Sequence, residues 1–166
     1  MGTADRRQHV ISLTWAQLHQ DVRSLAAQLA GKGTFRGIVA VARGGLVPAG
    51  ILARACNIFL VETVCIRSCE AQIYAPEARV LKAFSQDEGL GWLAVDDMAA
   101  TGRTAALLRA MLPKAHIAAV YAKEQGMACI DSFAVMVPRD SWLIFPWDSQ
   151  FRPSSQQQKK AVAGKA

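Results

Sequence analysis

The chain has 166 residues, of which 52% are hydrophobic and 19% charged, and its formal net charge is +6. This length favours one domain, and this much apolar material excludes a globally disordered protein. The sequence has neither an apolar run that would span a membrane nor a secretory signal, and its four cysteines are too sparse for a disulfide framework. We therefore expect a cytoplasmic protein with reduced cysteines.

Helices and strands are predicted to alternate along most of the chain. The first helix follows Thr14, a good N-cap, and ends before Gly31. The expected strands are apolar runs over residues 37–42, 59–66, 92–95, 116–121 and 133–137. Further helices are expected over residues 46–56 and 104–111. This alternation is typical of an α/β domain with a mainly parallel sheet flanked by helices.

Segments that follow strands are the candidates for a site, because parallel α/β sheets bind ligands beyond the carboxyl ends of their strands. These segments cover residues 43–47, 67–88, 96–104 and 122–127. Residues 67–88 are too many for a structureless connector, so they predict either a flexible active-site flap or a short antiparallel hairpin over the site. The domain is expected to cover residues 11–152, between a loose lead at 1–10 and a mobile tail at 153–166.

The segment that carries most chemistry runs from Asp96 to Thr104. A predicted buried strand delivers adjacent carboxylates to the edge of the sheet, and a turn of small residues leads from them into a helix. Backbone N–H groups at the start of that helix, with the hydroxyls of Thr101 and Thr104, favour a bound phosphate. Carboxylates beside a phosphate site indicate a polyhydroxyl ligand or a Mg²⁺ ion between them. Together these features point to a sugar phosphate.

Paired aspartates followed by small residues and Thr-Gly resemble the motif that binds phosphoribosyl diphosphate (PRPP) in type I phosphoribosyltransferases. Further motifs are similar, in the same order, to the xanthine-guanine phosphoribosyltransferase family over residues 11–149. They lie at residues 41–48, 63–66, 113–116, 122–123, 140–143 and 146–148. The resemblance implies the type I phosphoribosyltransferase fold, with a flexible flap and a small C-terminal base-binding hood.

The resemblance also implies which residues bind PRPP. Arg43 and Gly44 would hold its diphosphate. Asp96 and Asp97 are the catalytic candidates and would bind the ribose, with Asp97 also reaching a Mg²⁺ cofactor. The 5-phosphate would be bound by Thr101, Gly102, Arg103 and Thr104, and the preceding Met98, Ala99 and Ala100 are further substrate-binding candidates. A solvated loop charge is the alternative role for Arg43.

A purine base is the second substrate that the resemblance implies. Lys123 would donate a hydrogen bond to O6 of the purine and so select 6-oxo over 6-amino bases, unless it is a plain surface lysine. Trp142 would stack on the purine and the Leu143 backbone would meet its edge, unless Trp142 is a buried core residue. The reaction would join guanine, xanthine or hypoxanthine to the phosphoribosyl group, as in purine salvage. A homo-oligomer, either a tetramer or a dimer, is implied as well.

Ala100 departs from the family pattern, which has a third acid at this position facing N7 of the purine as the proton acceptor. Because acid–base catalysis is worth about 10²–10⁴ in rate, we expect slow turnover. Adenine phosphoribosyltransferases resemble the chain in having Ala before Thr-Gly, so Ala100 does not by itself forbid catalysis. Arg103 replaces a common glycine, and the basic residues near the register of the family's flap are Arg79 and Lys82.

Two other functions stay open at this point. The missing acid and the positive net charge also suit a catalytically weak or inactive regulator that senses PRPP or nucleotides. The second alternative is a phosphoribosyltransferase that acts on another base. Neither a helix-turn-helix nor an RNA-binding signature occurs in the sequence, so nucleic acid is not the expected partner, and a membrane is not expected either.

Overall fold

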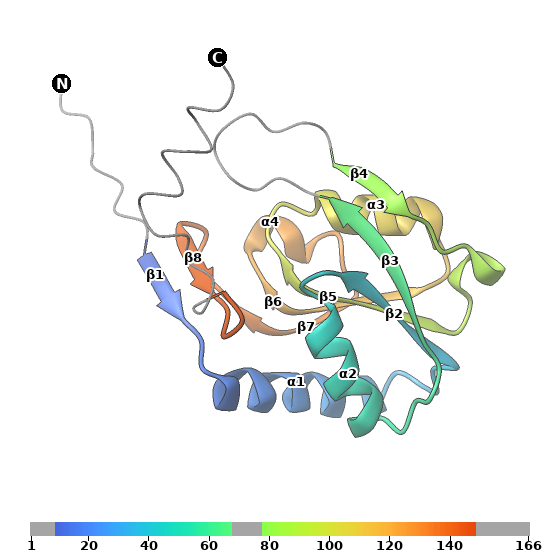
Figure 1. The fold of residues 1–166 in the computed structure, drawn as a ribbon, viewed down its shortest axis with the longest axis horizontal. Helices are drawn as coiled ribbons and strands as arrows, with labels where there is room; N and C mark the ends of the chain where they lie inside the picture. Colours follow the sequence, from blue (N-terminus) through green and yellow to red (C-terminus); the bar gives the residue numbers. More distant parts are fainter. Residues whose placement is uncertain (1–8, 68–77, 149–166) are drawn as a thin grey trace, which may run out of the picture. The chain divides into compact units, whose positions relative to one another are not determined.

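The computed structural model describes residues 9–67 and 78–148, and helices and strands alternate along them (Figure 1). The strands are β1 (His9–Ser12), β2 (Gly37–Ala42), β3 (Val61–Arg67), β4 (Arg79–Lys82), β5 (Trp92–Ala99), β6 (His116–Ala122), β7 (Ser132–Met136) and β8 (Ser141–Ile144). The helices are α1 (Trp15–Ala30), α2 (Leu46–Ala55), the short 3₁₀ helix η1 (Gln86–Gly89), α3 (Arg103–Met111) and α4 (Glu124–Met127). Within the described ranges, none of these helices has the length and apolar character that a membrane span requires.

The chain forms two compact units, which are described separately. The larger unit runs from His19 to Arg139 and contains the main sheet. In the smaller unit, β1 pairs in parallel with β8, and the Leu13 N–H donates to the Ile144 carbonyl at 2.9 Å. β1 begins at His9, inside the segment for which a loose lead was expected. The remainder of that lead and the tail at 153–166 lie outside the described residues.

Six strands form the main sheet, in the order β4-β3-β2-β5-β6-β7. β4 runs antiparallel to β3, whereas the other neighbouring strands are parallel. The predicted mainly parallel sheet is therefore confirmed. The long segment after β3 contributes an antiparallel hairpin strand, one of the two alternatives expected for it, while residues 68–77 lie outside the described ranges.

The sheet changes its direction of growth between β2 and β5. From β2 the chain passes through α2 to β3 on one side, and from β5 it passes through α3 to β6 on the other. Right-handed crossovers then place α2 and α3 on opposite faces of the sheet. The loops after β2 and β5 consequently diverge, and this switch point is where open α/β sheets bind ligands.

β5 is longer than the sequence predicted. The expected strand ended at Val95, but the pairing with β6 continues through Asp96 and Met98 to Ala99. Backbone hydrogen bonds to a neighbouring strand do not depend on side-chain polarity, so acidic residues at the edge of the sheet extend the ladder. Since successive side chains on a strand point to opposite faces, Asp96 and Asp97 project to different sides of the sheet.

Both faces of the central strands are buried, as their apolar sequences predict. One cluster packs against α3, and its members are Val39, Val41, Val64, Ile66, Phe84, Trp92, Ala94, Leu108, Leu112, Ala115 and Ile117. Leu93 and Val95 alternate with this cluster and are fully buried on the other face. In the larger unit, the buried Tyr121 hydroxyl donates to Asp21 Oδ2 at 2.7 Å and so fastens β6 to α1.

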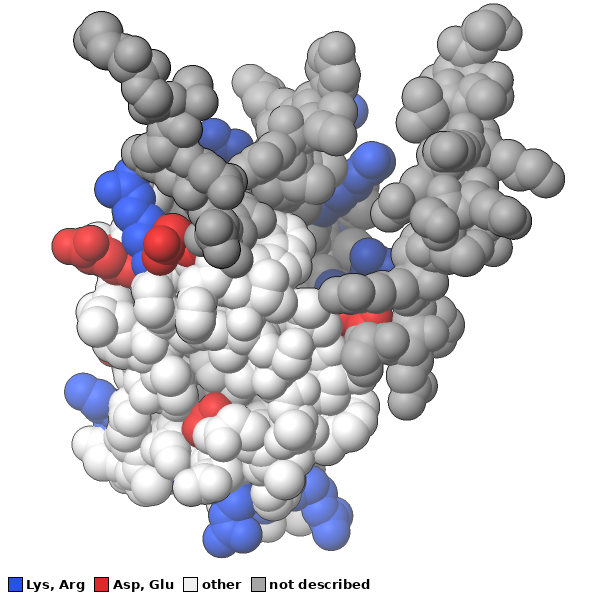
Figure 2. Space-filling view, turned by 90° about the vertical axis from the view of Figure 1, so that its left-hand side faces the viewer, with Lys and Arg blue, Asp and Glu red and all other residues white. Residues whose placement is uncertain are grey.

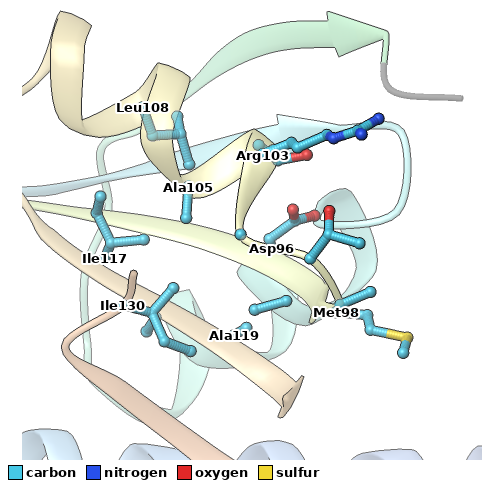
Figure 3. A pocket seen from close by; sticks show the side chains of 14 residues that line it. Asp96, Met98, Arg103, Ala105, Leu108, Ile117, Ala119 and Ile130 are labelled. Carbon is cyan, nitrogen blue, oxygen red and sulfur yellow. The ribbon is translucent and has the colours of Figure 1, made fainter. Parts of the chain in front are cut away.

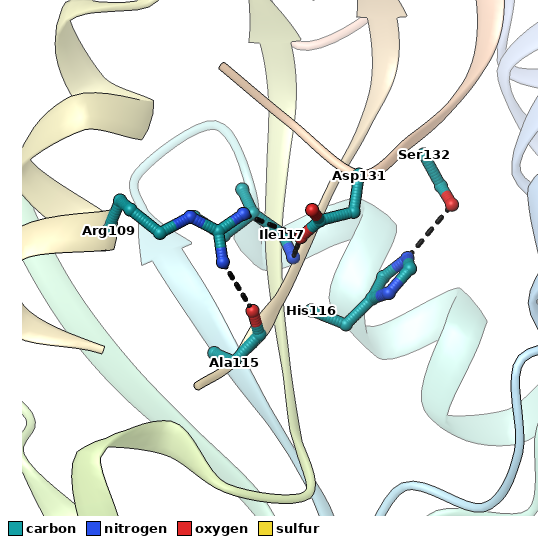
Figure 4. Close-up of polar contacts among 6 residues, drawn as sticks. All are labelled: Arg109, Ala115, His116, Ile117, Asp131 and Ser132. Atoms are coloured by element: carbon teal, nitrogen blue, oxygen red, sulfur yellow. Dashed lines mark hydrogen bonds and ion pairs between the residues drawn. The ribbon is translucent and has the colours of Figure 1, made fainter. Parts of the chain in front are cut away.

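A charged cluster ties α3 to the loop before β7 (Figure 4). Asp131 Oδ2 accepts hydrogen bonds from Arg109 Nη2 and from the Ile117 N–H, each at 2.7 Å. Arg109 Nη1 also donates to the Ala115 carbonyl at 2.8 Å. Burial disfavours the charged carboxylate, but the hydrogen bonds from Ile117 and Arg109 and the guanidinium charge outweigh it and hold the pKa of Asp131 below its ordinary value of 3.8.

We predict that Asp131→Asn lowers the free energy of unfolding by about 1–2 kcal/mol near pH 7, because charge-assisted hydrogen bonds are lost at a half-exposed site. A lowered folded-state pKa means that the unfolded chain binds more protons, so the stabilisation is present above pH 3.8 and is lost as the pH falls through the folded-state pKa. Urea unfolding of the wild type and of Asp131→Asn should therefore show a difference in unfolding free energy that narrows as the pH falls below 3.8.

Asp87→Asn is the matched control, because the Asp87–Arg36 ion pair at 2.6 Å is more exposed and should contribute about 0.5 kcal/mol or less. A difference between wild type and Asp131→Asn that is constant across this pH range would contradict the prediction.

Candidate functional site

The turn after β2 lies against β5. It leads from Ala42 through a cis peptide bond into Arg43, which is exposed. The Gly45 N–H donates to the Val41 carbonyl at 2.8 Å. A Cβ on Gly45 would overlap the backbone oxygen of Val95, so the close approach of this turn to β5 requires glycine.

Gly44 meets the side chain of Asp97. A Cβ added to Gly44 would overlap the carboxylate carbon and one of its oxygens, and would lie 2.8 Å from the other oxygen. The predicted diphosphate loop and one of the paired aspartates, which are far apart in the sequence, are therefore in direct contact. This contact lies at the switch point between β2 and β5.

The turn from β5 into α3 borders a small pocket on the α3 side of the sheet (Figure 3). Its walls come from residues 98–104, with Asp96 before them and Leu108, Ile117 and Ile130 on the inner side. In Figure 3 the side chains of Asp96, Arg103 and Met98 lie towards one end, and those of Leu108, Ile117 and Ile130 lie towards the other. Asp96 thus faces this pocket, whereas Asp97 faces Gly44.

Gly102 makes the tight turn into α3. Its φ of +80° is left-handed, a conformation that glycine adopts without strain. Its carbonyl accepts a hydrogen bond from the Ala106 N–H at 2.8 Å. The first N–H groups of a helix have no acceptor within the helix, so they are available to an anion between the exposed Thr101 and the half-buried Thr104.

Lys123 follows the last residue of β6. Its backbone N–H donates to the Ala99 carbonyl at 2.9 Å, which places its backbone beside the turn described above. The larger unit thus brings together Arg43, Gly44, both aspartates, the turn of residues 98–104 and Lys123.

Trp142 and Leu143 lie on β8 in the smaller unit. Trp142 pairs with Val10 and Leu143 pairs with Ile11. The Trp142 side chain is 44% exposed, in contrast to the 1% of Trp92, so the core alternative for Trp142 is wrong. Its ring is available to a flat ligand, whereas the Leu143 side chain is buried.

Arg67 is a candidate that the sequence interpretation missed. It ends β3 and pairs directly with Arg79 on β4, and both side chains are exposed. Like charges opposite each other destabilise an antiparallel pair, so this arrangement favours a bound anion. Lys82 is also exposed and donates to Thr63 Oγ1 at 2.7 Å. The position of Arg67 at the carboxyl end of a predicted parallel strand was the signal available in the sequence.

The carboxylates suit a Mg²⁺ ion that arrives with a substrate. Among the described residues, no group of three or more His, Cys, Asp or Glu side chains would form a complete metal site. Mg²⁺ is commonly bound by one or two carboxylates together with substrate phosphates. Asp97, in contact with the Gly44 turn, fits such a partial ligand set.

Comparison with known proteins decides the family. The model of the phosphoribosyl transferase domain matches residues 14–152. A xanthine-guanine phosphoribosyltransferase of Nitratidesulfovibrio vulgaris (strain Hildenborough) is 50% identical over 150 residues, covering 90% of this chain and 91% of the relative. One of Chromohalobacter salexigens is 47% identical over 144 residues, covering 87% of each chain. This chain belongs to the phosphoribosyltransferase family.

The fold of the phosphoribosyltransferase agrees with solved structures. The purine phosphoribosyltransferase from Pyrococcus horikoshii has a TM-score of 0.71 at 21% identity, covering 87% of this chain and 96% of that one. The Helicobacter pylori xanthine-guanine-hypoxanthine phosphoribosyltransferase has a TM-score of 0.70 at 17% identity, covering 92% and 99%. The predicted family, fold class and enzyme class, a pentosyltransferase, are confirmed.

We predict that Gly44→Ala weakens PRPP binding to this phosphoribosyltransferase at least about tenfold, because the new methyl group must displace the loop or the Asp97 carboxylate. The rise in melting temperature with added PRPP measures the loss, since a ligand stabilises the state that it binds.

Gly31→Ala is the control for this measurement, because its Cβ would make only an ordinary contact of 3.8 Å with the Gln28 carbonyl. If PRPP stabilises Gly44→Ala as strongly as Gly31→Ala, the contact with Asp97 does not shape the binding site.

Proposed function

We propose that the chain transfers the phosphoribosyl group of PRPP to a 6-oxopurine base and releases diphosphate, as an enzyme of purine salvage. The contact between Gly44 and Asp97 carries this proposal, because a single PRPP molecule needs a diphosphate site and a ribose site side by side. The names of the full-length relatives, xanthine-guanine phosphoribosyltransferases, support the choice of base.

In this proposal PRPP spans the switch point of the sheet. Arg43 and the Gly44 N–H bind its diphosphate, and Asp96 and Asp97 bind the ribose hydroxyls. The 5-phosphate docks on the N–H groups and hydroxyls of the turn that enters α3. The turn of small residues is suited to this role because it lets the ligand approach the backbone closely.

The C1′–O bond to diphosphate breaks as a bond from C1′ to the base nitrogen forms. Negative charge grows on the departing diphosphate, and guanidinium groups aimed at that charge stabilise the transition state more than the bound substrate. Arg43 lies after β2, and Arg67 and Arg79 extend the cationic surface from the neighbouring strands. Mg²⁺, held by Asp97 and the diphosphate, would supply further charge neutralisation.

The larger unit contributes Lys123 to the proposed selection of the base. The ammonium group of Lys123 only donates hydrogen bonds, so it suits the O6 acceptor of guanine, xanthine or hypoxanthine and disfavours the 6-amino group of adenine. Trp142 supplies a flat, exposed ring for stacking, and the Leu143 backbone offers hydrogen bonds to the edge of the base.

The position of Ala100 predicts that transfer is slow. The base loses a proton as the new bond forms, and the methyl group of Ala100 cannot accept it. Ala100 is 7% exposed and borders the pocket beside Asp96, so the proposed substrate-binding groups include no carboxylate at this position. The proton must then pass to water or to another acceptor.

We propose that the protein acts in the cytoplasm and assembles as a homo-oligomer.

A nucleic-acid-binding regulator is less well supported than an enzyme. On the face drawn in Figure 2, the described Lys and Arg side chains stand at several separate places, whereas a nucleic-acid groove needs them along one stripe. The relatives named as enzymes match nearly the whole chain, which favours an enzyme over a sensor.

The proposal is tested with PRPP, Mg²⁺ and a panel of guanine, xanthine, hypoxanthine, adenine and pyrimidine bases, scored by diphosphate release. We expect release with the 6-oxopurines and little with adenine. If PRPP raises the melting temperature but no base is consumed, the protein is a PRPP-sensing regulator and the proposed enzyme activity is wrong. If only a different base is consumed, the 6-oxopurine specificity is wrong.

We further predict that Ala100→Asp raises kcat with guanine at least about tenfold, towards the 10²–10⁴ that acid–base catalysis is worth, and leaves KM for PRPP nearly unchanged. Ala27→Asp, which adds the same charge at an exposed site on α1, is the control. An Ala100→Asp variant no faster than Ala27→Asp would mean that another group already accepts the proton.

A further inference from the structure

The turn formed by Lys123 to Ile130 contacts the PRPP-binding turn at two points, and the mechanism above uses neither. The first contact is made by Gly126, which is buried in α4. A Cβ on Gly126 would overlap the carbonyl carbon and oxygen of Ala99 and would lie 3.0 Å from its Cβ. The helical turn therefore rests directly on the backbone of Ala99.

The Ala99 carbonyl has a second role at the same place. It accepts the hydrogen bond from the Lys123 N–H at 2.9 Å. The Gly126 N–H in turn donates to the Lys123 carbonyl at 2.8 Å. A side chain at position 126 would have to push α4 away or rotate the Ala99 carbonyl, and either movement shifts the backbone of Lys123.

The second contact is made by Cys129, three residues further along. A Cβ on Gly102 would lie 2.5 Å from Cys129 Sγ and 3.2 Å from its Cβ, so this half-buried side chain packs against the left-handed turn at the start of α3. The Cys129 N–H donates to the Gly126 carbonyl at 3.0 Å, which fixes one contact relative to the other.

Packing around these contacts makes the arrangement rigid. Ala99, Ala119 and Ala122 are buried small residues, and the partly buried Met127, Ile130 and Phe133 pack against them. Interiors with few voids do not yield to an added methyl group without a shift of the backbone. The turn between Gly126 and Cys129 therefore holds the loop from Ala99 to Gly102 at both of its ends.

We propose that Gly126 and Cys129 are positioning residues that set the separation between the purine site at Lys123 and the 5-phosphate site at Thr101 to Thr104. A nucleoside 5′-monophosphate carries a base and a 5-phosphate at one spacing, so this reaction needs the two sites at a matching distance. Gly126 acts on the base through Lys123, and Cys129 acts on the phosphate through Gly102. This inference rests on the proposed function.

The test compares KM for guanine and KM for PRPP among variants of the full chain. Gly126→Ala should raise KM for guanine about tenfold, the effect of one weakened hydrogen bond, with a smaller change in KM for PRPP. Cys129→Leu should raise KM for PRPP about tenfold, and the nearly isosteric Cys129→Ser should restore it. Gly50→Ala is the matched control, because no atom lies within 4 Å of its added Cβ.

A double-mutant cycle separates positioning from a general structural role. If Gly126 acts through Lys123, adding Gly126→Ala to Lys123→Met raises KM for guanine no further. The inference would be overturned if Gly126→Ala raised KM for guanine equally in the wild type and in Lys123→Met. It would also be overturned if the Gly126 and Cys129 variants had the same kinetic constants as Gly50→Ala. Should Gly126→Ala give no folded protein, Cys129→Leu and Cys129→Ser test the same arrangement through KM for PRPP.

Failure of this inference is distinct from failure of the proposed function. If the wild-type chain transfers no phosphoribosyl group to a 6-oxopurine, the proposed function fails. If the wild type transfers it while the Gly126 and Cys129 variants behave like the control, only the positioning role is wrong.

Discussion

The close approach of the Gly44 backbone to the Asp97 carboxylate is the contact on which the rest of the site depends. It exists because the sheet reverses its direction of growth between β2 and β5, so that the loops after these neighbouring strands leave towards opposite faces. Only a residue without a side chain permits the approach. It joins a loop suited to diphosphate with an acid suited to ribose, the combination that PRPP requires.

The side chains of the two paired aspartates point to opposite faces of the sheet because these residues are consecutive in one strand. Asp97 faces the turn before α2, and Asp96 faces the pocket beside α3. A pair of acids in a loop would have no such fixed divergence. The extension of β5 to Ala99, through its pairing with β6, therefore shapes the proposed site as well as the sheet, and it leads the backbone directly into the turn of residues 100–104.

The proposed function assigns substrate binding and proton transfer to different residues. The larger unit holds the groups that we propose for binding diphosphate, ribose and phosphate, whereas the position proposed for the proton acceptor holds Ala100, which is buried in the turn after β5. The geometry of that turn is maintained from outside by Gly126 of α4 and by Cys129, which follows α4, because these two residues contact the two ends of the turn. In the proposed function, binding thus depends on backbone placement, and the rate depends on the carboxylate that Ala100 replaces.

The sequence by itself determined the family, the α/β class and most candidate residues, because the Asp-Asp to Thr-Gly segment and the turn at Arg43 are local motifs. The strand predicted from the sequence ended at Val95, before the observed end of β5 at Ala99. The polarity of a side chain indicates burial and does not indicate whether the backbone pairs with a neighbouring strand. Only the tertiary structure decided the Gly44–Asp97 contact, the pairing of Arg67 with Arg79, the exposure of Trp142 and the contacts of α4. Each of these arises from strand register or packing between segments distant in the chain, which no local pattern encodes.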